Sequence, residues 1–193
     1  MKYVISRYNH HLAWLADYSS DFVLYDRSEI PLAGAISVPN VGSDIFDKLS
    51  FIIDHYEHLP EVATYIKANL FDYIKPREFE KIKDNQTFTP ILSQDHHTYM
   101  PVCWYKNGMY CERNDYWYLH EHPTKYADEI IKFFDMDKRA YNEFAPGSNY
   151  ILPKANILQH PKEVYEQLRS YLDWTVYPGE AQLLERNLYY LWK

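Results

Sequence analysis

Across residues 1–70, short apolar runs each lead into polar side chains whose chemistry suits a phosphate or a sugar. Arginine pairs with phosphate through two parallel hydrogen bonds, lysine supplies a mobile point charge, and a carboxylate meets ribose hydroxyls in nucleotide-binding folds. Because the carboxyl ends of parallel strands meet at one edge of a sheet, we expect these side chains to surround one ligand site. The candidates are Arg7, Asn9, Asp26, Asn40, Gly42, Lys67 and Asn69.

The turn at residues 38–44, of sequence VPNVGSD, joins a short apolar run to a long amphipathic segment. Gly42 allows backbone angles that a Cβ atom would block. We expect Ser43 or Asp44 to cap the following helix, whose free N–H groups attract anions. Alternatively, the negative charge of Asp44 at the helix N-terminus interacts favourably with the helix dipole.

Strands and helices must position these residues, and residues 1–70 predict both. Apolar runs indicate strands, and apolar residues at helical spacing indicate helices between them. A helical connection between strands favours parallel pairing. The sequence therefore predicts an α/β fold with a mixed, mostly parallel sheet flanked by helices. The expected strands are 3–5, 21–25, 34–38 and 62–66, and the expected helices are 9–16 and 45–58.

Residues 75–193 form a less regular pattern with no linker or internal repeat, so we expect one domain over residues 1–193. Asn107-Gly108 indicates a hairpin turn between strands at 101–105 and 109–112. Hydrophobic spacing predicts a strand at 149–152 and helices at 75–83, 125–134, 161–174 and 180–192.

The composition argues against two classes of partner. The formal net charge of −7 and the absence of a Lys/Arg run disfavour nucleic acid, and no apolar stretch is long enough to cross a bilayer. Cys103 and Cys111 are too few for a disulfide framework, and the first residues lack the apolar region of a signal peptide. We therefore expect a reduced, cytoplasmic setting. The 20 tyrosines suit a sugar or nucleotide surface, although compositional bias explains them equally.

Several short motifs occur in the order typical of one family of uncharacterised domains, and together they span residues 3–192 with a weaker middle. The chain resembles this domain-of-unknown-function family, which is itself similar to glycosyltransferases of the GT-A type. Those enzymes bind a nucleotide-sugar at the carboxyl ends of their amino-terminal strands. The motifs are Arg7-Tyr8-Asn9, Trp14, Tyr25-Asp26, Pro39-Asn40-Val41-Gly42, His55-Tyr56, Leu59-Pro60, Phe144-Ala145-Pro146-Gly147, residues 161–165 and Glu185-Arg186.

The resemblance implies a glycosyltransferase with a nucleotide-binding half at 1–74 and an acceptor-side half at 75–193. The candidates at the strand ends would hold the donor, with a UDP-sugar favoured, and the acceptor would be a glycan or a glycoprotein. Glu185, with Asp44, would supply the carboxylate that takes the proton of the acceptor hydroxyl. Trp104, Trp117 and Gly147 would lie on the acceptor side. Ion pairs, turns, helix caps and ordinary core packing are the plainer roles for these residues.

Two departures from the family pattern bear on the metal. In metal-dependent GT-A enzymes, the strand that corresponds to 62–66 ends in Asp-x-Asp, which holds Mn²⁺ or Mg²⁺ against the diphosphate. In this chain the strand leads into Lys67-Ala68-Asn69 instead. Either Lys67 neutralises the diphosphate without a metal, or Asp72 alone ligates an ion. The turn also continues Ser43-Asp44 in place of a basic and then an acidic residue, which removes one phosphate contact.

The sequence is also consistent with two other functions. The missing Asp-x-Asp is consistent with a catalytically inactive module of the same fold that binds a nucleotide or glycan. A zinc-dependent hydrolase is the third hypothesis, because His120 and His122 would share one face of a strand. No Cys-x-x-Cys or His-x-x-x-His spacing supports zinc.

Overall fold

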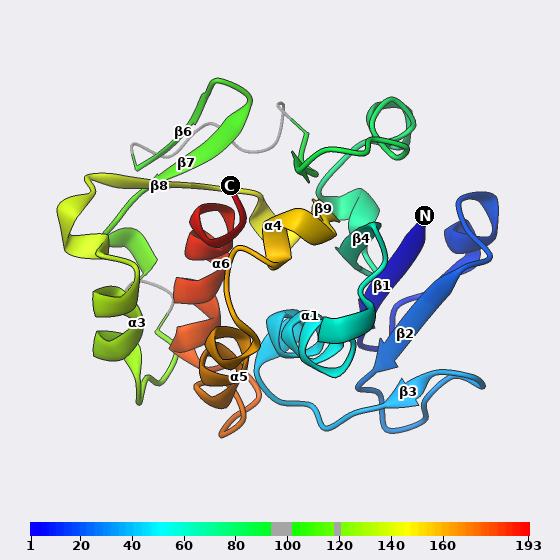
Figure 1. The fold of residues 1–193 in the computed structure, drawn as a ribbon, viewed down its shortest axis with the longest axis horizontal. Helices are drawn as coiled ribbons and strands as arrows, with labels where there is room; N and C mark the ends of the chain where they lie inside the picture. The colour runs from blue at the N-terminus through cyan, green and yellow to red at the C-terminus, as the bar shows by residue number, and fades with distance from the viewer. Residues whose placement is uncertain (94–101, 118–120) are drawn as a thin grey trace.

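The computed structural model describes residues 1–93, 102–117 and 121–193, and shows an α/β fold built on a six-stranded sheet (Figure 1). The strand order is β3-β2-β1-β4-β9-β5. β1 to β4 are mutually parallel, β9 runs antiparallel to β4, and β5 runs antiparallel to β9. The strands are β1 (Lys2–Arg7), β2 (Phe22–Asp26), β3 (Ile36–Ser37), β4 (Val62–Lys67), β5 (Thr89–Pro90) and β9 (Tyr150–Pro153).

The register aligns the carboxyl ends of the three neighbouring strands β2, β1 and β4. Arg7 of β1 pairs with Asp26 of β2, and Ser6 of β1 pairs with Lys67 of β4. The apolar runs of the sequence predicted these three strands and the polar residues at their carboxyl ends. The mostly parallel sheet of the sequence-based prediction is therefore confirmed, and its polar residues meet at one edge.

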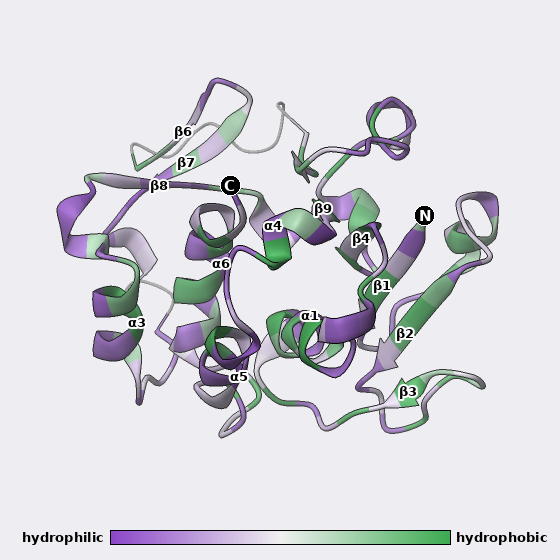
Figure 2. Ribbon diagram, in the orientation of Figure 1, coloured by the Kyte–Doolittle hydropathy of each residue, from purple (hydrophilic) through white to green (hydrophobic). Residues whose placement is uncertain are grey.

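Alternating side chains of the strands form two cores, one on each face of the sheet. Val4, Tyr25 and Tyr65 pack with the long helices, whereas Ile5 and Ile66 pack with short helical turns on the other face. Figure 2 shows hydrophobic residues along β1 and β2 and on helix α1. The long helices are α1 (Ser43–Asp54), α5 (Lys162–Ser170) and α6 (Gly179–Trp192), and the short turns are η1 (Ala13–Asp17), η3 (Leu70–Asp72) and α2 (Pro76–Phe79).

A small antiparallel sheet packs beside α6. It has the order β6-β7-β8, with β6 (Cys103–Lys106), β7 (Met109–Arg113) and β8 (Tyr141–Phe144). Asn107 and Gly108 have φ angles of 53° and 80°, so the predicted hairpin turn is confirmed. β8 was not predicted, because its sequence YNEF places the polar Asn142 in the interior.

The remaining helices differ from the predictions at their ends. The predicted helix 45–58 is α1 followed by the separate turn η2 (Tyr56–His58), and the predicted helix 9–16 is only the later turn η1. α3 (Ala127–Phe133) and α6 lie where helices were expected, while η5 (Met136–Lys138) and α4 (Lys154–Ile157) were not predicted. The short turn η6 (Pro146–Ser148) lies just before β9. Within the ranges described, no helix combines the length and apolar character that a bilayer crossing requires.

Candidate functional site

A cleft opens where β1 and β4 end, at the point where the strand order of the sheet reverses. Open α/β sheets bind their ligands at this switch point. The cleft has a volume of about 170 Å³, which is below the 300–1,000 Å³ of a pocket that encloses a whole drug-sized ligand. It therefore has room for only part of a ligand of that size. Its walls are formed by Ser6, Arg7, Tyr8, His10, Arg27, Asn40, Ser43, Asp44, Lys67, Asn69 and Tyr177.

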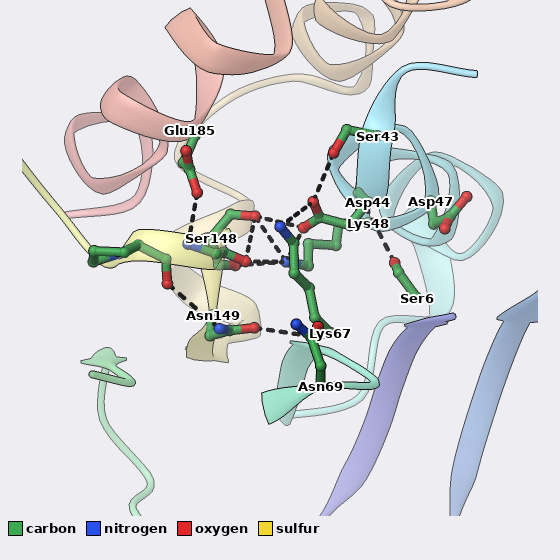
Figure 3. Close-up of polar contacts among 12 residues, drawn as sticks. Ser6, Ser43, Asp44, Asp47, Lys48, Lys67, Asn69, Ser148, Asn149 and Glu185 are labelled. Atoms are coloured by element: carbon green, nitrogen blue, oxygen red, sulfur yellow. Dashed lines mark hydrogen bonds and ion pairs between the residues drawn. The ribbon is translucent and has the colours of Figure 1, made fainter. Parts of the chain in front are cut away.

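Asp44 lines the cleft and lies between two lysines (Figure 3). Its Oδ2 accepts hydrogen bonds from Lys48 Nζ at 2.6 Å and from Ser148 Oγ at 2.6 Å. Its Oδ1 lies 3.2 Å from Lys67 Nζ and accepts a hydrogen bond from Ser43 Oγ at 2.9 Å. We call Asp44, Lys48 and Lys67 the lysine–aspartate cluster.

The two lysines of the cluster have different environments. Lys48 is fully buried, and its ammonium also donates to the carbonyls of Gly147 and Ser148 at 3.1 and 2.7 Å. Lys67 keeps 24% of its side chain exposed and lines the cleft. Lys48 therefore anchors α1 to the 146–148 turn, whereas Lys67 can reach a ligand.

The charges of the cluster stabilise one another. Burial would raise the pKa of Asp44, but Lys48 and Lys67 outweigh burial and hold this pKa far below its usual range. Burial lowers the pKa of Lys67, yet the carboxylates of Asp44 and Glu185 raise it above its ordinary value. Both groups consequently stay charged across the physiological range.

The start of α1 is fixed by backbone contacts. Gly42 is the N-cap, with a φ of 65°, and its N–H donates to the carbonyl of Thr175 at 2.9 Å. A Cβ atom at Gly42 would lie 2.7 Å from Cβ of Leu172 and 2.8 Å from its carbonyl oxygen. The prediction that Ser43 or Asp44 caps the helix is wrong, because Gly42 is the N-cap and no side chain caps the helix. Ser43 Oγ instead donates to Asp44, whose carboxylate faces the two lysines.

Arg7 reaches the cleft from the end of β1 and is held there by a carboxylate behind it. Its Nη1 donates to Asp26 Oδ2 at 2.6 Å and to Ser28 Oγ at 2.7 Å, and its Nε donates to the carbonyl of His10. Asp26 is fully buried and also accepts from the backbone of Ser28 and Leu32. Asp26 therefore positions Arg7 and does not itself line the cleft.

A second arginine fixes the turn that carries Asn40. Arg27 donates to both oxygens of Asp47 at 2.8 Å and to the carbonyls of Val41 and Ser43. Both members of the pair are buried. The sequence did not point to this pair, although Asp44, Asp47 and Lys48 fall among the apolar positions of α1, a spacing that signals buried charge.

Glu185 joins the cluster through the 146–148 turn. Its Oε1 accepts from the N–H of Gly147 at 2.6 Å, while the carbonyl of Gly147 accepts from Lys48. Gly147 has a φ of 79°, and a Cβ atom there would lie 2.8 Å from the ring of Tyr73. Figure 3 places Glu185 across the cluster from Ser6. Its other oxygen lies 3.4 Å from Nη1 of Arg186.

The structure therefore gathers five of the predicted site residues in the cleft and leaves the others beside or away from it. Arg7, Asn40, Asp44, Lys67 and Asn69 line it. Asn9 adopts a φ of 58° and donates its N–H to Ser28, next to the cleft wall. Gly42 and Asp26 support the wall from behind.

The predicted acceptor-side tryptophans lie elsewhere. Trp104 is on β6, where its ring packs edge-to-face on Tyr141. Trp117 is only 4% exposed and belongs to the large core, which favours a packing role. The sequence missed Tyr8, His10 and Tyr177 of the cleft wall and Lys48 behind it.

The described residues of the cleft do not fit a divalent cation. Asp72 is exposed, its Oδ2 accepts from Asn69 Nδ2 at 2.7 Å, and it does not line the cleft. Within the described parts of the chain, no three His, Cys, Asp or Glu side chains are grouped as metal ligands. His120 of the zinc hypothesis lies outside the described residues.

Comparisons of the chain with protein-family models, with curated proteins and with solved structures found no match. The class that fold and site define is an α/β protein with a charged cleft at the switch point of its sheet. The resemblance to a family of uncharacterised domains stays a prediction.

Proposed function

We propose that this protein is a glycosyltransferase of GT-A-type fold that moves a sugar from a nucleotide-sugar donor to a glycan or protein-linked acceptor. The observation that carries the proposal is the cleft at the switch point, where Arg7 of β1 and Lys67 of β4 face the same hollow. The strand order β3-β2-β1-β4 supports it, because this order reverses where such sheets bind nucleotides.

Different side chains of the cleft would bind different parts of the donor. Arg7 directs its Nη1 and Nε to the protein, and its Nη2 has no hydrogen-bond partner among the described residues, so that group is free for a phosphate oxygen. Asn40 and Asn69 offer amides to ribose or base. Tyr8 and Tyr177 are 44% and 54% exposed at the rim, where aromatic rings pack on a base or sugar face.

Glu185 is the better of the two predicted catalytic carboxylates. Asp44 accepts from two ammonium groups and two hydroxyls, and its low pKa makes it a poor proton acceptor. Glu185 has one strong backbone hydrogen bond and a longer contact to Arg186, and 17% of its side chain is exposed. We assign it the proton of the acceptor hydroxyl.

The proposal is tested by titrating the protein with UDP-, GDP- and dTDP-sugars in a calorimeter and by measuring sugar transfer and donor hydrolysis. We expect one donor to bind, and Glu185→Gln to slow transfer by about 100-fold or more while donor affinity is kept. Glu166→Gln on α5 removes the charge of an exposed helical glutamate away from the cleft; it is the control and should change neither. Absence of binding to every donor contradicts the proposal.

A second outcome of the same experiment identifies the inactive module. A protein that binds a nucleotide, releases no sugar and is indifferent to Glu185→Gln would be a binding domain of this fold. The departure of Lys67-Ala68-Asn69 from Asp-x-Asp is the observation that keeps this alternative open.

A further inference from the structure

The end of β4 holds an ammonium group where a metal-dependent transferase needs a carboxylate. Lys67 lines the cleft, and its backbone N–H donates to Asn149 Oδ1 at 2.9 Å, which fixes the end of the strand. The carboxylate that lines the cleft is Asp44, and four donors already surround its two oxygens. A divalent cation would have to displace a lysine to reach it.

The hydrogen bonds of Asp44 do not depend equally on the two lysines. Lys48 lies 2.6 Å from Oδ2, whereas Lys67 lies 3.2 Å from Oδ1, which also accepts from Ser43. The ion pair of Lys48 with Asp44 does not involve Lys67, and Lys48 is fully buried. Lys67 is therefore the movable charge of the cluster.

We propose that the Lys67 ammonium does the work of the divalent cation at the donor diphosphate, so that donor binding and transfer need no metal. This inference rests on the proposed glycosyltransferase function. On binding, Lys67 Nζ turns from Asp44 Oδ1 to a phosphate oxygen, and Asp44 keeps Lys48, Ser43 and Ser148. Arg7, at the end of the neighbouring strand, supplies the second positive charge.

The chemistry balances without a metal. The acceptor hydroxyl oxygen forms a bond to the anomeric carbon, and its proton passes to Glu185. The bond from that carbon to the diphosphate oxygen breaks, and its electron pair leaves with the diphosphate. A preorganised ammonium at the point where this negative charge develops stabilises the transition state.

The experiment compares calorimetric binding of UDP, GDP and dTDP in EDTA and in Mn²⁺ for the wild-type protein and two variants. We expect the wild type to bind one of these diphosphates equally well in both conditions. Lys67→Met should weaken this binding by about 10- to 100-fold, because it removes a hydrogen bond between charged groups. Lys138→Met removes an exposed lysine of η5 and serves as the control for net charge; it should bind as the wild type does.

The outcomes separate the inference from the proposed function. A wild type that binds the diphosphate only with Mn²⁺ overturns the inference and leaves the glycosyltransferase proposal standing, and so does a folded Lys67→Met that binds normally. Binding to no diphosphate in either condition overturns both. If Lys67→Met does not fold, Lys67→Arg, which keeps the positive charge, should still bind the diphosphate in EDTA. The comparison of wild-type binding in EDTA and in Mn²⁺ then decides whether a metal is needed.

Discussion

Two buried carboxylates meet cations in different halves of this molecule, and only one of these meeting points reaches a cleft. Asp44 at the start of α1 has Lys48 and Lys67 beside it. Glu112 of β7 accepts from Arg186 Nε of α6 at 2.5 Å, and both side chains are almost completely buried. Asp44 thus links α1 to β4 through Lys67, and Glu112 links β7 to α6 through Arg186. The pair of Glu112 and Arg186 is too deeply buried to meet a ligand.

The two sites differ in the number of cations beside the carboxylate and in the exposure of those cations. Burial raises the pKa of Glu112, and Arg186 offsets this only in part. Two ammonium groups instead hold the pKa of Asp44 far below its usual range. Arg186 is buried in its pair with Glu112, whereas Lys67 is partly exposed and lines the cleft. In this comparison, an exposed cation beside a buried carboxylate marks the site that can meet an anion.

Breaking the closed pair should have the largest effect on stability. Arg186→Met leaves Glu112 buried without its cation, and we expect a loss of about 3–5 kcal/mol in the free energy of unfolding. Urea unfolding measures it, and Lys162→Met, from the exposed pair with Glu166, should cost below about 0.5 kcal/mol. A loss below about 1 kcal/mol for Arg186→Met would contradict the structural role of this pair.

The cluster in turn depends on how α1 begins. Gly42→Ala places a Cβ atom against Leu172 at a positive φ, and we expect it to cost roughly 2–4 kcal/mol. Gly34→Ala has the same sign of φ but nothing within 4 Å, so we expect about 1 kcal/mol. Equal losses in thermal or urea unfolding would show that contact with Leu172 does not hold the helix start.

The ends of the strands could be predicted because a local pattern specifies them: apolar runs followed by Arg7, Asp26 and Lys67. The hairpin at Asn107-Gly108 was equally local. Lys48 and Ser148 could not be paired from the sequence, because 100 positions separate them and a buried lysine looks like a solvated one until the fold is known. The register of β1 with β4, which sets Ser6 beside Lys67, is also a long-range property.

Acid should act on the two carboxylates in opposite directions. The folded pKa of Asp44 lies below the unfolded value of about 3.9, so its stabilising contribution is present above that value and lost as the pH falls. The folded pKa of Glu112 is raised, so its contribution is present at low pH and lost as the pH rises through that pKa.

Urea unfolding of the wild type, Asp44→Asn and Glu112→Gln between about pH 6 and pH 3 measures these contributions. The stability gap between the wild type and Asp44→Asn should narrow by about 1 kcal/mol as the pH falls. As the pH falls over the same range, the stability of the wild type should increase relative to that of Glu112→Gln. Changes of the same sign in both variants would show that the two carboxylates are held alike.

The smallest effect should come from the aromatic residues of the two regions, which carry no charge. Tyr8 lies at the cleft rim with 44% of its surface exposed, so its ring can pack on the donor, whereas Trp104 of the small sheet packs on Tyr141. We expect Tyr8→Leu to weaken diphosphate binding by about threefold, or roughly 0.7 kcal/mol, and Trp104→Leu to leave it unchanged. Calorimetry with both variants measures this directly. A larger loss for Trp104→Leu would mean that the ligand reaches the small sheet. The cleft and the small sheet would then belong to one binding surface, and the contrast between them would fail.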